Sequence, residues 1–136
     1  RRNRTMTRHE IREEIFKGLF QANFYEGEDV DQQFDTYFED AGPYPEKDAE
    51  YIKTKSRDVV DHIDEIDKVI NDTSDGWKTT RMPKVDLTIM RLAVYEIKIE
   101  ELPFGVAINE AVELAKEYGE DSSPAFINGV LAKVVG

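Results

Sequence analysis

Arginines crowd the start of this acidic chain. The first 12 residues hold a single acid, Glu10, against five arginines: Arg1, Arg2, Arg4, Arg8 and Arg12. This stretch carries +4 and leaves -15 for the other residues, within a formal net charge of -11. Guanidinium groups bind phosphate through a planar fork of donors, so a cationic cluster apart from an anionic body favours a polyanion site. A solvated basic tail is the alternative interpretation.

The acidic remainder of the chain limits the kind of polyanion. Binding driven by counterion release needs positive charge at the phosphates, and a body at -15 would repel a long duplex beyond the local contact. We therefore expect a short partner that docks locally. Residues 26–50 hold ten Asp or Glu against Lys47 alone, which is typical of a solvated outer face, with metal or a basic partner as the alternative.

Most of the usual parts for catalysis are missing. The chain has no cysteine and only two histidines, His9 and His62, so it offers no zinc-ligand spacing and no thiol nucleophile. It also has no glycine-rich phosphate loop. We expect a binding protein, not an enzyme, with no catalytic residue, cofactor or metal.

Single-stranded RNA is a polyanion that suits the arginines at the start of the chain. Its recognition combines arginine contacts to phosphates with bases stacked on aromatic rings. Phe126, near the start of the last predicted helix, is the aromatic candidate, because a helix N-terminus also attracts phosphate. An ordinary core phenylalanine is the alternative for Phe126.

The sequence predicts that helices carry these residues. Apolar residues recur at helical spacing, and the alternation typical of strands is missing, so we expect an all-α, single-domain bundle of about six or seven helices over residues 1–136, with 1–6 as a flexible basic tail. Thr7 and Glu10 form a predicted capping box for the first helix. Arg8 and Arg12 follow one turn apart, off its predicted buried stripe of Ile11, Ile15, Leu19 and Ala22.

The later helices are bounded by glycine, proline and serine. We expect a second helix from about Asp29 to Gly42. Residues 46–71 should form one long helix, or two helices with a break near 60–63. A further helix should follow Pro83, and the next should end at Gly119. Ser123 is the predicted N-cap of the last helix, with Pro124 at its first position.

No apolar run approaches the ~20 residues of a membrane span, and nothing looks like a signal peptide. We expect a soluble, cytoplasmic protein with no membrane contact.

Four sequence blocks resemble the NusB family of bacterial transcription antitermination factors. Two are Val-Ala-Ile-Asn-Glu-Ala-Val-Glu-Leu-Ala-Lys at 106–116 and Phe-Ile-Asn-Gly-Val-Leu at 126–131. The others are Val-Asp at 85–86 leading into Met-Arg-Leu-Ala-Val-Tyr-Glu at 90–96, and Arg8-x-x-x-Arg12 leading to Leu-Phe-Gln at 19–21. The resemblance spans essentially the whole chain.

The resemblance implies an all-helical, NusB-like RNA-binding domain. Such a domain binds the boxA sequence of nascent ribosomal RNA transcripts as a heterodimer with NusE, a ribosomal protein, and joins a transcription elongation complex. Carried over by position, the RNA-binding residues are Arg4, Arg8, His9, Arg12 and Phe126. The contacts to NusE fall on Phe20 and Asp86.

Three alternatives stay open. The first is the RNA-binding part of a ribosomal RNA cytosine methyltransferase, although this chain has no room for a methyl-donor domain and no cysteine nucleophile. The second is a protein-only helical module that binds basic partners through its acidic surface. The third concerns the free protein, for which a homodimer that hides the arginine face is an alternative to a monomer.

Overall fold

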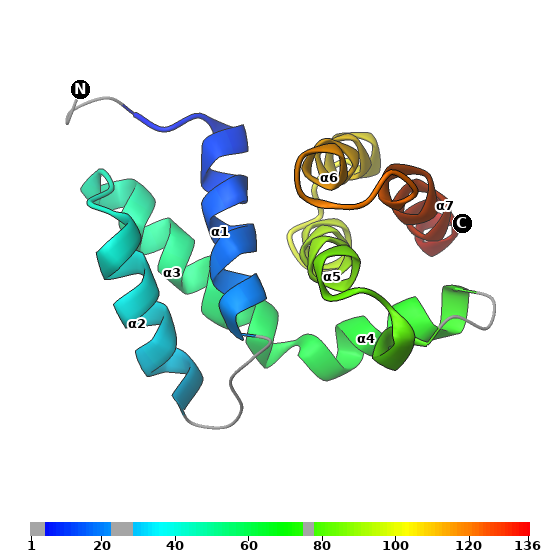
Figure 1. Ribbon diagram of the computed structural model, residues 1–136, viewed down its shortest axis with the longest axis horizontal. Coiled ribbons are helices and arrows are strands. Elements are labelled where there is room, and N and C mark those ends of the chain that lie inside the picture. Colours follow the sequence, from blue (N-terminus) through cyan, green and yellow to red (C-terminus); the bar gives the residue numbers. More distant parts are fainter. Residues whose placement is uncertain (1–4, 23–28, 75–77) are drawn as a thin grey trace. The chain divides into compact units, whose positions relative to one another are not determined.

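The computed structural model describes residues 5–22, 29–74 and 78–136. Within these ranges the chain forms seven α-helices, a short 3-10 helix and no strand, which confirms the all-α expectation (Figure 1). The chain divides into two compact units, residues 1–60 and 61–136, and each is described in turn. The single domain and the flexible tail over 1–6 stay predictions, and residues 1–4, which include Arg4, lie outside the described residues.

The first unit contains α1 (Arg8–Ala22), α2 (Asp29–Ala41) and nearly all of α3 (Glu46–Asp61). Phe34 and Phe38 of α2 stack with ring centroids 5.8 Å apart. A Cβ at Gly18 would clash with the Phe38 ring, so this glycine allows α1 and α2 to approach closely. The buried apolar residues of the unit are Ile15, Phe16, Leu19, Phe34, Phe38, Ile52 and Val59.

Polar contacts fix the start of α1. The predicted capping box is confirmed: the Thr7 amide donates to Glu10 Oε1 at 2.9 Å, and the Glu10 amide donates to Thr7 Oγ1 at 3.0 Å. The Met6 amide donates to Asp48 Oδ2 of α3 at 3.2 Å. Further along α1, Glu14 accepts a 2.7 Å hydrogen bond from the Tyr44 hydroxyl. Burial, together with this bond, raises the pKa of Tyr44 well above its usual range.

The second unit contains α4 (Ile63–Thr73), the 3-10 helix η1 (Thr79–Arg81), α5 (Lys84–Lys98), α6 (Phe104–Tyr118) and α7 (Ser123–Val135). The helical stretch over 46–71 is thus two helices, and His62 occupies the N-cap position of α4 without a side-chain capping bond. Helix α5 packs against α4, α6 and α7 (Figure 1). Arg91 of α5 donates to both carboxylate oxygens of Asp67 of α4, at 2.8 and 2.7 Å, a bidentate pair that fixes α4 against α5. The core includes Ile66, Ile70, Ile89, Met90, Leu92, Leu114, Ile127 and Leu131.

Helix α7 begins with a buried contact. The expectation that Ser123 is its N-cap is wrong, since Ser122 holds that position and Ser123 is the first helical residue. Ser123 Oγ donates to Asp86 Oδ1 of α5 at 2.7 Å and accepts from the Glu120 amide at 3.0 Å, so it does not cap its own helix. A Cβ at Gly119 would lie 2.7 Å from Ser123 Cβ, which explains the glycine by close approach.

None of the helices in the described part of the chain is both long and apolar enough to cross a lipid bilayer.

Candidate nucleic-acid interface

Arg8 and Arg12 differ sharply in exposure. Arg8 is the first residue of α1 and is exposed. Arg12 is only 8% exposed, so the expectation that it lies off the buried stripe is wrong. Residues three and four apart share a helix face, and Arg12 therefore lies one turn before the buried Ile15 and Phe16. Arg8 is the more accessible guanidinium for a phosphate.

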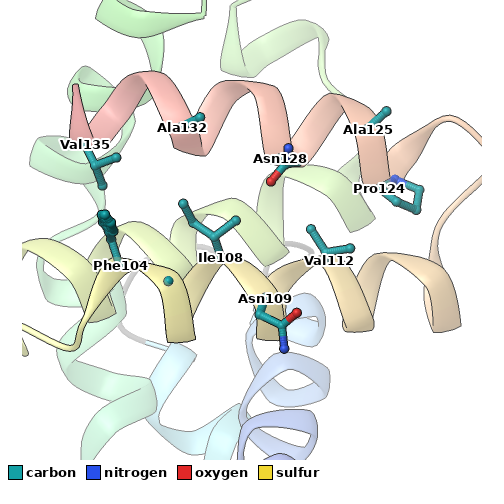
Figure 2. A pocket seen from close by; sticks show the side chains of 10 residues that line it. Phe104, Ile108, Asn109, Val112, Pro124, Ala125, Asn128, Ala132 and Val135 are labelled. Carbon is teal, nitrogen blue, oxygen red and sulfur yellow. The ribbon is translucent and has the colours of Figure 1, made fainter.

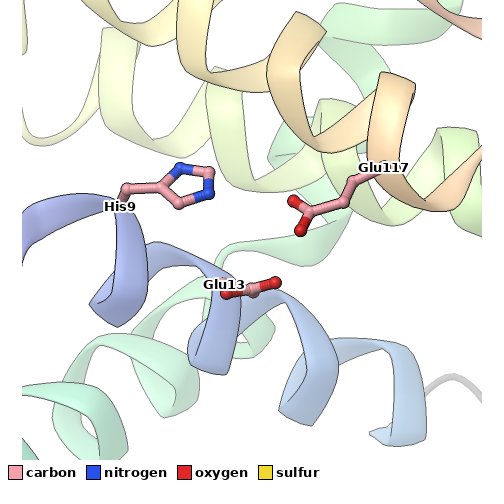
Figure 3. A group of neighbouring side chains, drawn as sticks. All are labelled: His9, Glu13 and Glu117. Carbon is pink, nitrogen blue, oxygen red and sulfur yellow. The ribbon is translucent and has the colours of Figure 1, made fainter.

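His9 follows Arg8 and is half-buried. It projects from the same side of α1 as Glu13, one turn further on (Figure 3). A half-buried imidazole at this place can donate or accept a hydrogen bond at an RNA contact.

The position of Arg8 does not help its own helix. The unpaired amides at a helix N-terminus carry partial positive charge, and a cation there is unfavourable by about 0.3–1 kcal/mol. An anion at the same place interacts favourably with both the amides and the guanidinium.

Phe126 lies on α7 and is half-buried. It lines a hollow of about 320 Å³, within the second unit, between the end of α4 and one side of α7. The described residues that line it are Thr73, Ser74, Ala125, Phe126, Gly129, Val130 and Lys133. The neighbouring Ile127 is fully buried, so the core packing falls to that residue and leaves Phe126 at the edge of a cavity. A ring in this setting can receive a nucleobase.

The sequence analysis did not single out Gly129 and Lys133, which line the same hollow as Phe126. They follow Phe126 by three and seven residues, a spacing that places all three on one side of a helix. The spacing was the available signal. Asp121 and Ser122, just before α7, are both exposed.

The other side of α7 has a different character. There α7 and α6 line an apolar groove of about 630 Å³ that lies within the second unit (Figure 2). None of the described residues that line it is charged: Phe104, Gly105, Ile108, Asn109, Val112, Pro124, Ala125, Asn128, Ala132 and Val135. A groove without a cation does not suit phosphate, so the hollow at Phe126 is the better candidate for RNA.

The two predicted NusE contacts lie in different surroundings. Phe20, near the end of α1, is half-buried, with its ring centroid 6.3 Å from that of Phe16. Asp86 is only 5% exposed and accepts the hydrogen bond from Ser123 Oγ. Asp86 therefore already has a role in holding α7, whether or not a partner reaches it.

Part of the acidic stretch interacts with cations of the same unit. Arg57 of α3 donates to Asp31 at 3.1 Å and to Asp35 at 3.0 Å, and Lys53 lies 3.3 Å from Asp35. These pairs are solvent-exposed, and such pairs contribute little to stability. They do engage two carboxylates of α2 within the chain, which reduces the charge that this face offers to a basic partner.

Comparisons with known proteins agree on one family. The NusB family model matches residues 9–136. The transcription antitermination protein NusB of Agathobacter rectalis is 49% identical over 129 residues, which cover 94% of this chain and 98% of that protein.

Solved structures agree with the sequence comparisons. The structure of NusB from T. maritima superposes with a TM-score of 0.86 at 32% identity, over 96% of this chain and 92% of that one. A chain from a crystal structure of the antitermination factors NusB and NusE with double-stranded RNA gives a TM-score of 0.82 at 26% identity, over 95% and 97%. The chain described here belongs to the NusB family.

Proposed function

We propose that this chain is a transcription antitermination factor that binds the boxA RNA of nascent ribosomal RNA transcripts together with NusE. The observation that carries the proposal is Phe126, half-buried beside a hollow that also has a lysine, in a chain of the NusB family. Aromatic stacking with a nearby cation is the usual chemistry of single-stranded RNA recognition. The function involves no catalysis.

The RNA-binding residues divide into two groups. Arg4, Arg8, His9 and Arg12 would bind the sugar–phosphate backbone, and among the described members Arg8 has the largest share because it is exposed. Phe126 would stack on a base. Backbone contacts supply affinity that falls with salt, whereas stacking depends little on salt.

NusE would contact the chain at Phe20 and Asp86. Ribosomal proteins bind RNA and are commonly basic, so the net charge of -11 would steer this partner during encounter. The pair would then act within a transcription elongation complex in the cytoplasm. The free protein would be a homodimer or a monomer, and sedimentation measurements over a range of concentrations distinguish the two.

Titrations of labelled RNA by fluorescence anisotropy test the proposal. We expect tighter binding of a single-stranded boxA-like oligonucleotide than of a scrambled one or of its own duplex. The duplex belongs in the test because the solved NusB–NusE complex contains double-stranded RNA, while the acidic body of this chain disfavours it.

The same titrations repeated with NusE test the ternary assembly. NusE should raise the affinity for boxA RNA, and by linkage the RNA should raise the affinity for NusE by the same factor. Binding of NusE that is unaffected by RNA would contradict the proposal and would favour the protein-only module that uses the acidic surface.

A further inference from the structure

The apolar groove between α6 and α7 has the composition of a docking surface. None of the described residues that line it is charged, in a chain that is 35% charged. Phe104 and Val135 lie next to each other at one end of the groove and are 50% and 38% exposed (Figure 2). Exposed apolar side chains without charged neighbours are typical of the centre of a protein–protein interface, because solvated surfaces are rich in charge.

The spacing of the lining residues suits a helix. Gly105, Ile108 and Val112 of α6 follow one another at intervals of three and four residues. The lining residues of α7 repeat in the same way: Ala125, Asn128, Ala132 and Val135. Alternating intervals of three and four form the seam along which a further helix packs. At Gly105 an added Cβ would meet no heavy atom within 4 Å, so a helix backbone can approach closely there.

Helix α5 shows that α6 and α7 can hold a third helix between them. It packs against both, and none of its residues is among the described residues that line the groove. A helix in the groove would contact the same two helices from their solvent-exposed side. The lining residues of α7 run from Pro124 to Val135, roughly 16 Å at 1.5 Å per residue, which accommodates about three helical turns.

One end of the groove is acidic. Val112 and Pro124 mark this end in Figure 2, and the chain between them connects α6 to α7. Its charged residues are all exposed, and they are four acids against one lysine: Glu113, Glu117, Glu120, Asp121 and Lys116. A second copy of this chain, with a net charge of -11, would be repelled. A segment that carries Lys or Arg at one end would be attracted.

We propose that this groove binds an amphipathic helix of a partner protein, with an apolar stripe of about three turns against α6 and α7 and with Lys or Arg residues over the acidic end. An amphipathic helix in an apolar groove is a common mode of peptide recognition. The proposal goes beyond RNA binding, because it gives the chain a further protein-binding surface. Phe126 and the predicted NusE contacts Phe20 and Asp86 are not among the residues that line the groove.

Synthetic helical peptides of about three turns test the proposal on the full chain. The first peptide has leucine and alanine at intervals of three and four residues and lysines at one end. The second has glutamates in place of the lysines, and the third keeps the lysines but scrambles the apolar positions. Calorimetry should show the first peptide binding about tenfold or more tightly than the other two. Absence of binding by the first peptide, or equal binding of all three, would overturn the proposal.

Gly105→Lys tests where the first peptide binds. Its long cationic side chain would enter the groove and should lower the affinity for the peptide by about tenfold, while stability changes little because lysine is the better helix former. Val106→Lys is the matched control, since Val106 is exposed, adjacent and not among the lining residues. This control should bind the peptide like the wild type.

Glu113→Gln combined with Glu120→Gln tests the acidic end. The double variant should weaken binding of the first peptide about fivefold at low salt and much less at high salt, because salt screens exposed charges. Asp64→Asn combined with Glu65→Gln removes two exposed carboxylates of α4 and is the charge-matched control. Equal losses in the two double variants would reduce the effect to net charge and overturn the proposed orientation of the helix over the acidic end.

Three further outcomes would overturn the inference. Equal affinity of Gly105→Lys and Val106→Lys for the first peptide would place the peptide outside the groove. A wild type that sediments as a dimer and a Gly105→Lys variant that sediments as a monomer would assign the groove to a second copy. Loss of boxA RNA binding in Gly105→Lys alone would assign the groove to RNA. The proposed RNA-binding function is tested separately, by the RNA titrations.

Discussion

The start of α1 and the Phe126 side of α7 both carry candidate RNA-binding residues, but they present opposite chemistry. The start of α1 offers charge: Arg8 is exposed in the first helical turn, beside amides that also attract anions. The side of α7 offers shape: Phe126 and Gly129 line a hollow, and Lys133 is the one cation among the described residues that line it. In the proposed RNA complex, charge and stacking thus come from separate helices, and the salt dependence of binding can separate their contributions.

The two regions are also held in place differently. The start of α1 depends on the Thr7–Glu10 capping box and on the hydrogen bond from the Met6 amide to Asp48. Helix α7 is anchored by the buried bond from Ser123 to Asp86 and by core residues such as Leu131. Substitutions in the anchors should therefore affect stability, while substitutions at Arg8 and Phe126 should affect binding.

The largest effect on binding is expected from Phe126→Ala. Loss of a stacking platform should cost roughly 1 to 3 kcal/mol of RNA affinity and leave the salt slope unchanged, because no phosphate contact is removed. Anisotropy titrations at several salt concentrations measure both quantities. Phe126→Tyr is the control that keeps the ring. A large drop in melting temperature with unaltered RNA affinity would instead make Phe126 a core residue.

The next largest effect is expected from loss of the hydrogen bond between Ser123 and Asp86, which anchors α7. Ser123→Ala removes the donor of a buried 2.7 Å hydrogen bond and leaves Asp86 without it, which should cost about 2 kcal/mol of unfolding free energy in urea melts. Asp121→Asn, at an exposed position just before α7, should cost almost nothing.

Asp86→Asn separates the anchoring of α7 from partner binding, because Asp86 is also a proposed NusE contact. If Asp86 touches NusE, Asp86→Asn should weaken NusE binding more than Ser123→Ala does at equal stability. Equal NusE affinities for the two variants, measured by calorimetry, would leave Asp86 with the anchoring role alone.

Loss of the capping box should lower the free energy of unfolding by less than loss of the bond from Ser123 to Asp86. Thr7→Ala removes the hydroxyl that accepts from the Glu10 amide and should cost about 1 kcal/mol of unfolding free energy. Thr5→Ala, outside the helix and exposed, is the matched control. If thermal melts show the two variants to be equally stable, the capping box does not hold the start of α1.

The smallest change is expected from Arg8→Gln. Removing one phosphate contact should lower the magnitude of the log-log salt slope by ~0.7 and weaken RNA binding mostly at low salt. Lys68→Gln, which removes an exposed lysine of α4 paired with Asp72, should leave the slope unchanged. Identical slopes for Arg8→Gln and the wild type would remove Arg8 from the RNA contact.

The sequence predicted elements that depend on local chemistry. The Thr7–Glu10 spacing, the break near 60–63 and the proline before α5 all specify structure over a few residues, and each agrees with the helices observed. The prediction that Arg12 lies off the buried stripe was wrong, because the burial of this side chain depends on what packs against α1. Ser123 was misassigned as an N-cap because its partner, Asp86, lies 37 residues away in sequence.

In the candidate site, too, the features that depend on tertiary packing were not visible in the sequence. Phe126 emerged from family resemblance, since its residue type alone is equally typical of a core. Gly129 gave no signal in the sequence beyond its spacing from Phe126, because the meaning of a helical glycine depends on what surrounds it. The space that the described residues leave open at Gly129, and the end of α4 across the hollow, are properties of tertiary structure.

A double-mutant cycle on one boxA-like oligonucleotide tests most directly whether α1 and α7 both bind the RNA. Affinities are measured for the wild type, Arg8→Gln, Phe126→Ala and the double variant at one low salt concentration. Each single variant should bind more weakly than the wild type, and the free-energy losses should add in the double variant, since the two side chains share no contact in the RNA complex that we propose. A double variant that binds no more weakly than the poorer single variant would contradict this account.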